Sequence, residues 1–303
     1  MTPIDPTAFA GFHSGFVALV GPPNAGKSTL LNRMLGEKIS ITSRKPQTTR
    51  NRILGIVHRP NAQLVFIDTP GVHRAHQPLN VRIVDTALSA LGDVDLVLLM
   101  ADPLRPDRDA ENFLLSRLAD IKKPVVLAVN KMDRITPDQL IECLDQWSRR
   151  FAFQQIVPIS ALQGTQVDDL LGVMEALLPE GPPFYAPDML TDSAERFIVA
   201  EMIREKVFRL TGDEIPYATA VTVDTFTETQ KGKMMRIGAT IHVERDSQKG
   251  MVIGRGGKKL KQIGLAARED IEKLLYTKVY LELFVRVQKN WTRDTRALRK
   301  FGY

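Results

Sequence analysis

The stretch Gly21-Pro-Pro-Asn-Ala-Gly-Lys-Ser28 follows the apolar run Phe16–Val20 and opens the amphipathic stretch Lys27–Leu35. It fits the pattern GxxxxGK[ST], whose glycines let backbone amides turn toward phosphate oxygens at a helix N-terminus. The flanking strand and helix are the context that this pattern requires. We therefore predict a phosphate-binding loop, in which Lys27 reaches the β and γ phosphates and the Ser28 hydroxyl binds Mg²⁺. The predicted contacts are Gly21, Pro22, Pro23, Asn24, Ala25, Gly26, Lys27, Ser28 and Thr29.

Short apolar runs alternate with amphipathic stretches through residues 15–178. This alternation predicts an α/β domain, with a mostly parallel sheet and helices on both faces. Trp147 and Cys143 are interpreted as core or packing residues of this domain. The expected strands are Phe16–Val20, Ile53–His58, Leu64–Asp68, Leu96–Met100, Val125–Asn130 and Gln155–Pro158, and the expected helices include Lys27–Leu35, Ala110–Leu118 and Pro137–Phe151.

Two further motifs select the base of the nucleotide, because a phosphate loop alone does not separate ATP from GTP. Asn130-Lys131-Met-Asp133 ends an apolar run. A carboxylate at Asp133 can accept both N1–H and N2–H of guanine, a pair of donors that adenine does not offer. Ser160-Ala161-Leu162 follows the last expected strand, where a backbone amide can meet guanine O6. We therefore predict GTP and GDP as ligands, held by Asn130, Lys131, Asp133, Ser160, Ala161 and Leu162.

A third motif is expected to complete the metal site. Asp68-Thr69-Pro70-Gly71 ends an expected strand, so Asp68 is placed to hold Mg²⁺ through water and the Gly71 amide to contact the γ-phosphate. A polar segment, 43–51, lies between the first helix and the second strand. Thr49, preferred over Thr48, is expected to join Ser28 and Asp68 around the metal. Thr69 and Pro70 are counted with the nucleotide contacts.

As a set, these motifs resemble those of the translation-factor-related class of bacterial P-loop GTPases. The resemblance covers residues 21–162 and rests on GPPNAGKS, QTTRN, DTPG, NKMD and SAL. Ras-like GTPases carry a water-orienting glutamine directly after DxxG, whereas this chain has Val72, so slow hydrolysis is expected. GTPases with asparagine at the Asn24 place often resemble potassium-dependent enzymes, which gives the hypothesis that Asn24 helps hold K⁺. The predicted catalytic residues are Asn24, Lys27, Thr49 and Gly71, and His73 and His76 are interpreted as surface loop residues.

The C-terminal part has a different element order and a different charge. The segment Pro179–Asp188 holds four prolines and a glycine, which predicts a linker at 181–192. Residues 1–180 carry 19 Lys and Arg against 19 Asp and Glu, and residues 181–303 carry 22 against 16. A basic half suggests a polyanionic partner, although a solvated basic surface explains the charge equally well.

A helix at Ser193–Leu210 is followed by strands at Tyr217–Phe226 and Met235–Val243. A short segment to Ile253, a helix at Lys258–Leu275 and a strand at Lys278–Val287 come next. This α-β-β-α-α-β order, with GxxG between helical segments, looks like a smaller α+β type II KH domain, whose loop clamps single-stranded RNA. The predicted RNA contacts are Ile253, Gly254, Arg255, Gly256, Gly257, Lys258, Lys259 and Lys261.

The last residues, 289–303, form a basic tail in which Arg293, Arg296 and Arg299 would share one side of a helix, with Trp291 and Leu298 available for packing. An RNA-contacting tail and an ordinary solvated helix fit this spacing equally well. The predicted division is therefore a GTPase domain at 1–180, a linker at 181–192, a KH domain at 193–288 and this tail.

A GTPase domain joined to one KH domain resembles the Era family. The resemblance implies binding to 16S ribosomal RNA near its 3′ end, assistance in maturation of the 30S subunit, and possible peripheral association with the inner membrane. A monomer is expected. Two alternatives stay open at this point: a P-loop kinase or ATPase, which NKMD opposes, and a membrane-signalling GTPase whose basic domain meets anionic lipid, which GxxG opposes.

Composition sets outer limits on these predictions. The 303-residue chain has 44% hydrophobic and 25% charged residues, values typical of a globular protein with a real core. A single cysteine excludes an internal disulfide framework and fits a reducing compartment. The N-terminal residues lack the apolar run of a signal peptide, and no apolar stretch approaches the ~20 residues of a membrane span. A cytoplasmic protein is expected.

Overall fold

The computed structural model describes residues 9–42, 53–69, 93–211, 215, 219–229, 234–294, 297–298 and 301. The chain divides into two compact units, and the division falls between Asp192 and Ser193. The described residues 40–42 belong to the second unit, although they precede most of the first unit in sequence. Within the described ranges, no helix is both long and apolar enough to cross a membrane.

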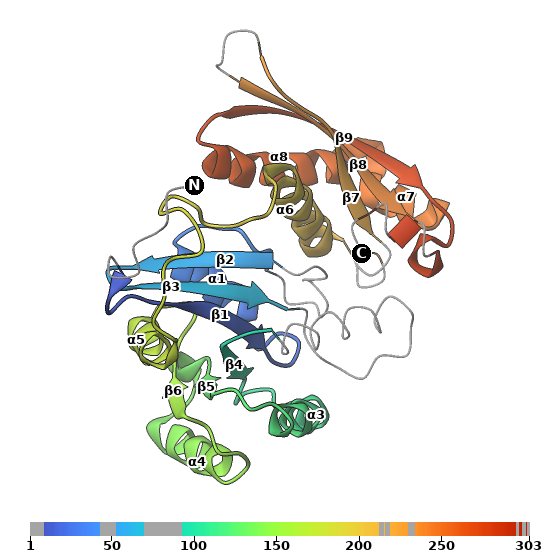
Figure 1. Cartoon of the computed structure of the whole chain (residues 1–303). Helices are drawn as coiled ribbons and strands as arrows, with labels where there is room; N and C mark the ends of the chain where they lie inside the picture. Colours follow the sequence, from blue (N-terminus) through green and yellow to red (C-terminus); the bar gives the residue numbers. More distant parts are fainter. Residues whose placement is uncertain are drawn as a thin grey trace. The chain divides into compact units, whose positions relative to one another are not determined.

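The first unit is built on a six-stranded sheet (Figure 1). Its strand order is β2-β3-β1-β4-β5-β6, and β2 runs antiparallel to β3 while the other neighbours are parallel. This confirms the mostly parallel sheet. The strands are β1 (His13–Val20), β2 (Ile53–Arg59), β3 (Ala62–Asp68), β4 (Leu96–Ala101), β5 (Val125–Val129) and β6 (Gln155–Pro158).

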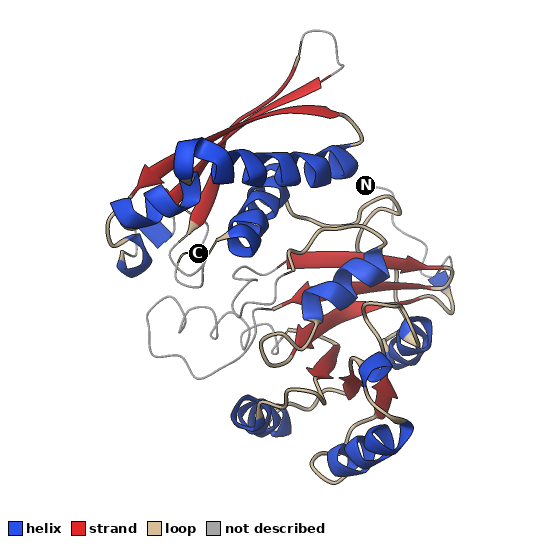
Figure 2. Cartoon of the chain, turned by 180° about the vertical axis from the view of Figure 1, so that it is seen from behind, coloured by secondary structure: helices blue, strands red, loops and turns tan. Residues whose placement is uncertain are grey.

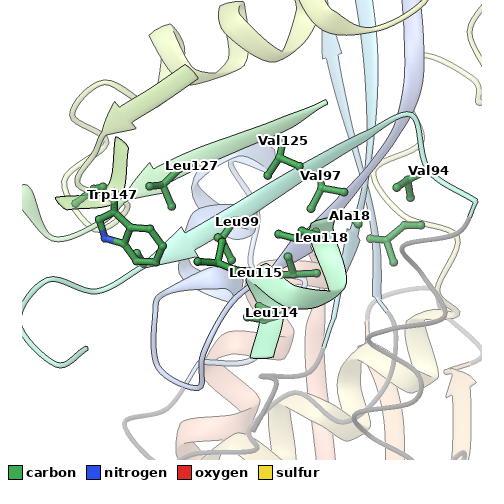
Figure 3. Close-up of a cluster of buried hydrophobic side chains, with 14 residues drawn as sticks. Ala18, Val94, Val97, Leu99, Leu114, Leu115, Leu118, Val125, Leu127 and Trp147 are labelled. Carbon is green, nitrogen blue, oxygen red and sulfur yellow. The ribbon is translucent and has the colours of Figure 1, made fainter. Parts of the chain in front are cut away.

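Helices cover both faces of this sheet. They are α1 (Lys27–Leu35), α3 (Arg108–Ala119), α4 (Pro137–Ser148) and α5 (Val167–Leu177). One hydrophobic cluster joins α3 and Trp147 of α4 to the central strands, as Figure 3 shows for Leu114, Leu115 and Leu118 beside Val97 and Leu99. Trp147 is buried in this cluster, and the half-buried Cys143 packs against it, where burial raises the pKa of its thiol.

The elements agree closely with the patterns that predicted them, and the differences lie at their ends. The helix α4 ends at Ser148 instead of Phe151, because the chain turns at Arg149, and Phe151 then packs on Phe153 with ring centroids 5.0 Å apart. The helix α5 was not among the predicted elements. Asn130, expected as the last residue of a strand, lies directly after β5.

The segment predicted as a linker lies along the first unit. The Gln63 side chain on β3 accepts from the backbone amides of Phe184 and Tyr185, and Ile56 donates its amide to Leu190 O at 2.8 Å. Phe184 also packs on Phe16, with ring centroids 4.9 Å apart. The proline-rich segment therefore covers part of the sheet over β2 and β3, although it forms no strand itself.

The second unit has a three-stranded sheet, ordered β7-β8-β9, with helices packed on it (Figures 1 and 2). Its elements are α6 (Glu195–Leu210), β7 (Ala220–Glu228), β8 (Met234–Val243), α7 (Asp246–Ile253), α8 (Lys258–Leu275) and β9 (Lys278–Val287). The predicted α-β-β-α-α-β order is confirmed. β7 and β8 are antiparallel, and the α7–α8 crossover returns β9 parallel to β8.

The tail is part of the second unit's core where it is described. Trp291 is fully buried and packs edge-on against Phe301, with ring centroids 5.2 Å apart. Phe301 also stacks on His242 of β8, and Leu298 is buried. The side chains of Arg293, Arg296 and Arg299 lie outside the described residues, so an RNA-contacting role for them stays a prediction.

Candidate functional site

The predicted nucleotide motifs gather at one edge of the first sheet. The loop Gly21–Gly26 follows β1, Asp68 ends β3, Asn130 follows β5 and Ser160 follows β6. These strands are parallel, so their carboxyl ends lie at the same edge of the sheet. The strand order changes direction at β1, which has β3 on one side and β4 on the other, and ligands of such sheets bind at this point. The described residues of the predicted site are thus brought together by topology.

The phosphate loop depends on backbone conformations that glycine adopts without strain. Gly26 has φ 106°, and a Cβ built on it would clash with the Asn130 amide nitrogen. Gly21, at φ 156°, would place a Cβ 2.5 Å from the Met100 carbonyl oxygen. Asn24 has φ 62° and an exposed side chain at the tip of the loop. Both glycines therefore allow close packing against neighbouring strand ends.

A lysine, a hydroxyl and a carboxylate meet at the start of α1. Lys27 is buried and donates from Nζ to Gly21 O at 2.9 Å and Pro22 O at 3.0 Å. Ser28 Oγ donates to Asp68 Oδ2 at 2.9 Å. Burial lowers the pKa of Lys27 to about 8, an effect that the Asp68 charge partly opposes. The carbonyl oxygens of Gly21 and Pro22 thus hold the Lys27 ammonium in the phosphate loop, and phosphate oxygens of a bound nucleotide would take over as its acceptors.

The Asn130 side chain joins two loops of the site. Its Nδ2 donates to Ala25 O at 2.8 Å, and its Oδ1 accepts from the Ala161 amide at 2.9 Å. Only 3% of Asn130 is exposed. The residue predicted to contact the base therefore ties the phosphate loop to the loop after β6.

The residues next to Asn130 differ in how far they are exposed and how they are held. Lys131, at φ 67°, donates from Nζ to Asn24 O at 3.2 Å and pairs with Asp102. Asp133 is exposed and is the middle residue of the short 3₁₀ turn Met132–Arg134. Leu162 is 71% exposed, whereas Ser160 and Ala161 are buried. The arrangement presents the Asp133 carboxylate to solvent while Lys131 stays fixed against the phosphate loop.

Two residues that shape the site, Asp102 and Arg33, were not predicted from the sequence. Asp102 follows β4 and holds Lys131, so its place at a strand end was the available signal. Arg33 of α1 donates to the carbonyl oxygens of Ala161 and Leu162. Thr69, predicted as a nucleotide contact, donates its hydroxyl to Leu19 O at 2.8 Å and so joins the end of β3 to β1, while its contact to the nucleotide stays a prediction.

Several predicted site residues lie outside the described residues. These are Thr48, Thr49, Pro70, Gly71, Val72, His73 and His76. The choice of Thr49 over Thr48, the Gly71 contact to the γ-phosphate and the surface interpretation of the two histidines stay predictions.

The predicted RNA loop connects α7 to α8. Gly254 has φ 71° and ψ 173°, and a Cβ there would lie 2.7 Å from Lys259 Cβ, so this position requires glycine. Gly256, at φ 59°, has no atom within 4 Å of a built Cβ. Val252 beneath the loop is fully buried, whereas Ile253 is half-buried.

Basic side chains surround this loop on its solvent side. Arg255, Lys258 and Lys261 are exposed and Lys259 is half-buried. Three of these four cationic side chains are therefore accessible to a phosphate group, and so is the backbone of Gly256.

Fold and site together define a P-loop GTPase unit followed by a KH unit. The family described as 50S ribosome-binding GTPase matches residues 16–131, and the KH domain family matches residues 214–292. GTPase Era of Geobacter metallireducens is 55% identical over 96% of this chain and 98% of its own length. GTPase Era of Geotalea uraniireducens is 53% identical with the same coverage.

Solved structures match over the same extent. A variant of Aquifex aeolicus Era bound to GDP·AlF₄⁻ has a TM-score of 0.92 and 39% identity, covering 96% of this chain and 99% of that one. Era in complex with MgGDPNP and nucleotides 1506–1542 of 16S ribosomal RNA has a TM-score of 0.92 and 38% identity, with the same coverage. The chain belongs to the Era family of GTPases.

The Asn130 contacts predict a loss of nucleotide affinity in Asn130→Asp. The variant keeps the acceptor for the Ala161 amide but loses the donor to Ala25 O and places a charged oxygen against that carbonyl. We expect GDP binding to weaken about 10- to 100-fold, the effect of leaving buried polar groups mismatched. Titration with a fluorescent GDP analogue measures it.

The matched control for that change is Asn32→Asp on α1, whose Oδ1 accepts from the Ile39 amide and keeps doing so. It should leave affinity within about twofold. Equal affinities for the wild type and Asn130→Asp would contradict the joining role.

The buried Lys27 predicts pH-dependent nucleotide binding. Its pKa is about 8 in the free protein, and bound phosphates favour the charged form and raise it. Binding therefore takes up a proton above that pH, so affinity should be constant below about pH 8 and fall up to tenfold per pH unit above it. GDP titrations from about pH 7.5 to about pH 9.5 measure this slope. Lys27→Met should bind more weakly and show no slope, and a pH-independent wild type would refute the assignment.

Proposed function

We propose that this chain is a ribosome assembly factor that hydrolyses GTP slowly and whose nucleotide state controls its binding to 16S ribosomal RNA near the 3′ end. The proposal rests on the presence of two sites in one chain. The guanine-nucleotide motifs gather at one edge of the first sheet, and a basic GxxG loop has an unobstructed backbone at Gly256. A relative of 38% identity and nearly equal length is described in complex with MgGDPNP and nucleotides 1506–1542 of that RNA.

The metal proposed for the nucleotide site is Mg²⁺. Ser28 Oγ and Asp68 Oδ2 lie 2.9 Å apart, and oxygen ligands of this kind suit a small hard cation that keeps several waters and binds phosphate. Among the described residues no cluster of three His, Cys, Asp or Glu side chains could hold a metal. Magnesium would neutralise charge on the β and γ phosphates, and Thr49 is the proposed further ligand.

For hydrolysis, the described residues position and stabilise the phosphates. Lys27 at the base of the loop and the amides that open α1 would face the charge that develops on the transferring group. Val72 stands where related enzymes have a water-orienting glutamine, so the attacking water lacks that support. A slow rate is the expected consequence.

An activating K⁺ is the proposed compensation for that missing support. The exposed Asn24 side chain stands at the tip of the loop, and its backbone is fixed by Lys131. Its amide oxygen would hold the cation beside the phosphates, where a positive charge stabilises the transition state.

In the second unit, the GxxG loop would clamp the backbone of a few unpaired nucleotides. Arg255, Lys258, Lys259 and Lys261 supply attraction through counterion release. Assistance in 30S subunit maturation, action as a monomer in the cytoplasm and peripheral contact with the inner membrane belong to the same proposal and rest on the family resemblance.

The potassium hypothesis predicts faster GTP hydrolysis in potassium buffer than in sodium buffer. We expect a stimulation of about tenfold or more, since a fixed charge at a developing negative charge acts strongly in a water-poor site. Asn24→Gly keeps the positive φ without strain and removes the amide oxygen, so it should lose the stimulation. Equal wild-type rates in the two buffers would exclude an activating K⁺.

Replacement of Gly256 tests the RNA loop. Aspartate tolerates the positive φ and meets no neighbour there, so Gly256→Asp should fold but repel phosphate, and binding to nucleotides 1506–1542 of 16S ribosomal RNA should fall at least about 100-fold. Fluorescence anisotropy measures this, with GDP binding unchanged.

Gly256→Asn is the matched control, because it has the same shape without the charge, and it should lose at most a small part of the affinity. Equal RNA binding by the Asp and Asn variants would argue against phosphate contact at this loop.

A further inference from the structure

The loop after β6 is closed at its base by its own backbone. The Ser160 amide donates to Thr165 O at 3.1 Å, and the Gly164 amide donates to Ser160 O at 2.7 Å. The Gln163 amide donates to Ser160 Oγ at 3.2 Å. These bonds make the loop a compact turn whose tip is residues 161–162, part of the segment predicted to meet guanine O6.

The tip of this loop is held by an arginine of another element. Arg33, in the last turn of α1, donates from Nε to Ala161 O at 3.4 Å and from Nη2 to Leu162 O. Its stem crosses Gly164, where a built Cβ would lie 3.5 Å from Arg33 Cδ. One guanidinium therefore engages two successive backbone carbonyls, a geometry that its planar fork of donors suits.

Holding Ala161 O also orients the Leu162 amide. The two groups belong to one trans peptide unit, in which C=O and N–H point in opposite directions. The Leu162 N–H is therefore directed away from the Arg33 guanidinium. It donates to no acceptor among the residues that the structure describes, whereas the Ala161 amide donates to Asn130 Oδ1 at 2.9 Å. The loop thus offers an uncommitted backbone donor at Leu162.

The contacts of Arg33 serve the geometry of the loop and not charge pairing. Within the described ranges, no carboxylate forms an ion pair with Arg33, and the acceptors of its guanidinium are the two carbonyl oxygens. The Leu162 side chain is 71% exposed, so apolar packing does little to fix the tip. Hydrogen bonds from Arg33 therefore carry most of the restraint on this peptide.

The helix α1 reaches from the phosphate loop to this second loop. Lys27 and Ser28 lie in its first turn, and Arg33 follows Ser28 by five residues, about 7.5 Å along the axis. All of these residues belong to the first unit, as does the loop after β6. Asn130 ties the two loops together at Ala25 and Ala161, and Arg33 adds a second tie at the tip.

We propose that Arg33 is a positioning residue for guanine specificity, which holds the carbonyls of Ala161 and Leu162 so that the Leu162 amide faces guanine O6. Adenine carries an amino group at this place, so it would present a donor to a donor. The inference rests on the predicted contact between this loop and O6 and names the residue that fixes it. Asp133, predicted to accept from N1–H and N2–H, reads a separate part of the base.

The test compares the dissociation constants of three nucleoside diphosphates. In 6-thio-GDP a sulfur atom, which is a weak acceptor, replaces O6 while N1–H and the N2 amine remain. IDP keeps O6 and N1–H and lacks the N2 amine. The ratio of 6-thio-GDP to GDP therefore measures the O6 contact, and the ratio of IDP to GDP measures the N2 contact. For the wild type we expect the first ratio to be about tenfold or more.

Replacement of Arg33 should change only the first of these ratios. Arg33→Met keeps an unbranched stem across Gly164 and removes the donors, so the 6-thio-GDP ratio should fall about fivefold toward one. The IDP ratio should stay within about twofold of the wild type, because the N2 contact is untouched. Arg33→Lys keeps a donor for one of the two carbonyls, and its 6-thio-GDP ratio should lie between those of the wild type and Arg33→Met.

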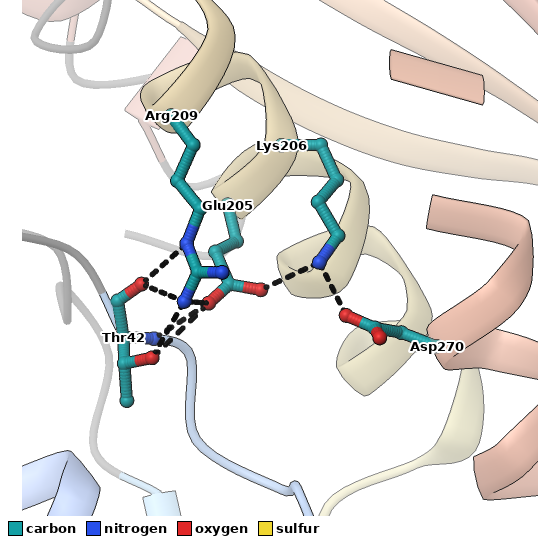
Figure 4. A network of polar contacts seen from close by, with 5 residues as sticks. All are labelled: Thr42, Glu205, Lys206, Arg209 and Asp270. Carbon is teal, nitrogen blue, oxygen red and sulfur yellow. Dashed lines mark hydrogen bonds and ion pairs between the residues drawn. The ribbon is translucent and has the colours of Figure 1, made fainter. Parts of the chain in front are cut away.

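Arg209→Met is the matched control, since Arg209 also lies in the last turn of its helix and holds a backbone carbonyl. Its Nε and Nη2 donate to Thr42 O at 3.2 and 3.0 Å in the second unit (Figure 4). In the same network Glu205 Oε1 accepts from the Thr42 amide at 3.2 Å, and Lys206 links Glu205 to Asp270 of α8. The control should lose stability and keep both nucleotide ratios.

The two ratios separate the possible outcomes. A wild-type 6-thio-GDP ratio of one would overturn the predicted O6 contact and this inference together. A wild-type ratio of about tenfold that survives in Arg33→Met would overturn this inference alone. A fall of both ratios in Arg33→Met would mean a general loosening of the base site, which also contradicts positioning at O6.

Discussion

The two hydrogen bonds of the Asn130 amide are the constraint on which the nucleotide site depends. They join the phosphate loop at Ala25 to the loop after β6 at Ala161, and they leave room only for a glycine at position 26. Lys131 then fixes Asn24, and Asp133 is exposed. The loop predicted to bind phosphate and the loop predicted to bind the base therefore share the Asn130 side chain, so a change in one loop alters a hydrogen bond of the other.

Parallel strands supply the platform for that assembly. The carboxyl ends of β1, β3, β5 and β6 lie at one edge of the sheet, so residues more than one hundred positions apart come within hydrogen-bond distance. Helices cover both faces, and the proline-rich segment through Tyr185 covers part of the sheet over β2 and β3. A segment without regular structure can do this because Gln63 satisfies its backbone groups.

In the second unit, a buried helix and the C-terminal chain form the core on which the GxxG loop is carried. Its α6 is buried over most of its length, charged residues included, and Trp291 and Phe301 of the C-terminal chain complete its core. The GxxG loop lies directly before the first turn of α8, with Gly256 exposed between Arg255 and Lys258. The polar network around Glu205 reaches from Asp270 of α8 to Thr42, which belongs to the same compact unit although it lies far away in the sequence.

Both architectures could be predicted from the amino-acid order, and so could the gathering of the described nucleotide motifs at strand ends, because local patterns carry them: period-two spacing, helical spacing and glycine-rich loops after apolar runs. The same patterns did not reveal Asp102, Arg33, the joining role of Asn130 or the hold of Glu205 on Thr42. Thr69 and the 181–192 segment gained their roles in the same way, from partners on distant strands. These are pairings between residues far apart in the chain, and they are established only when the packed fold buries particular polar groups together, so that they must satisfy one another.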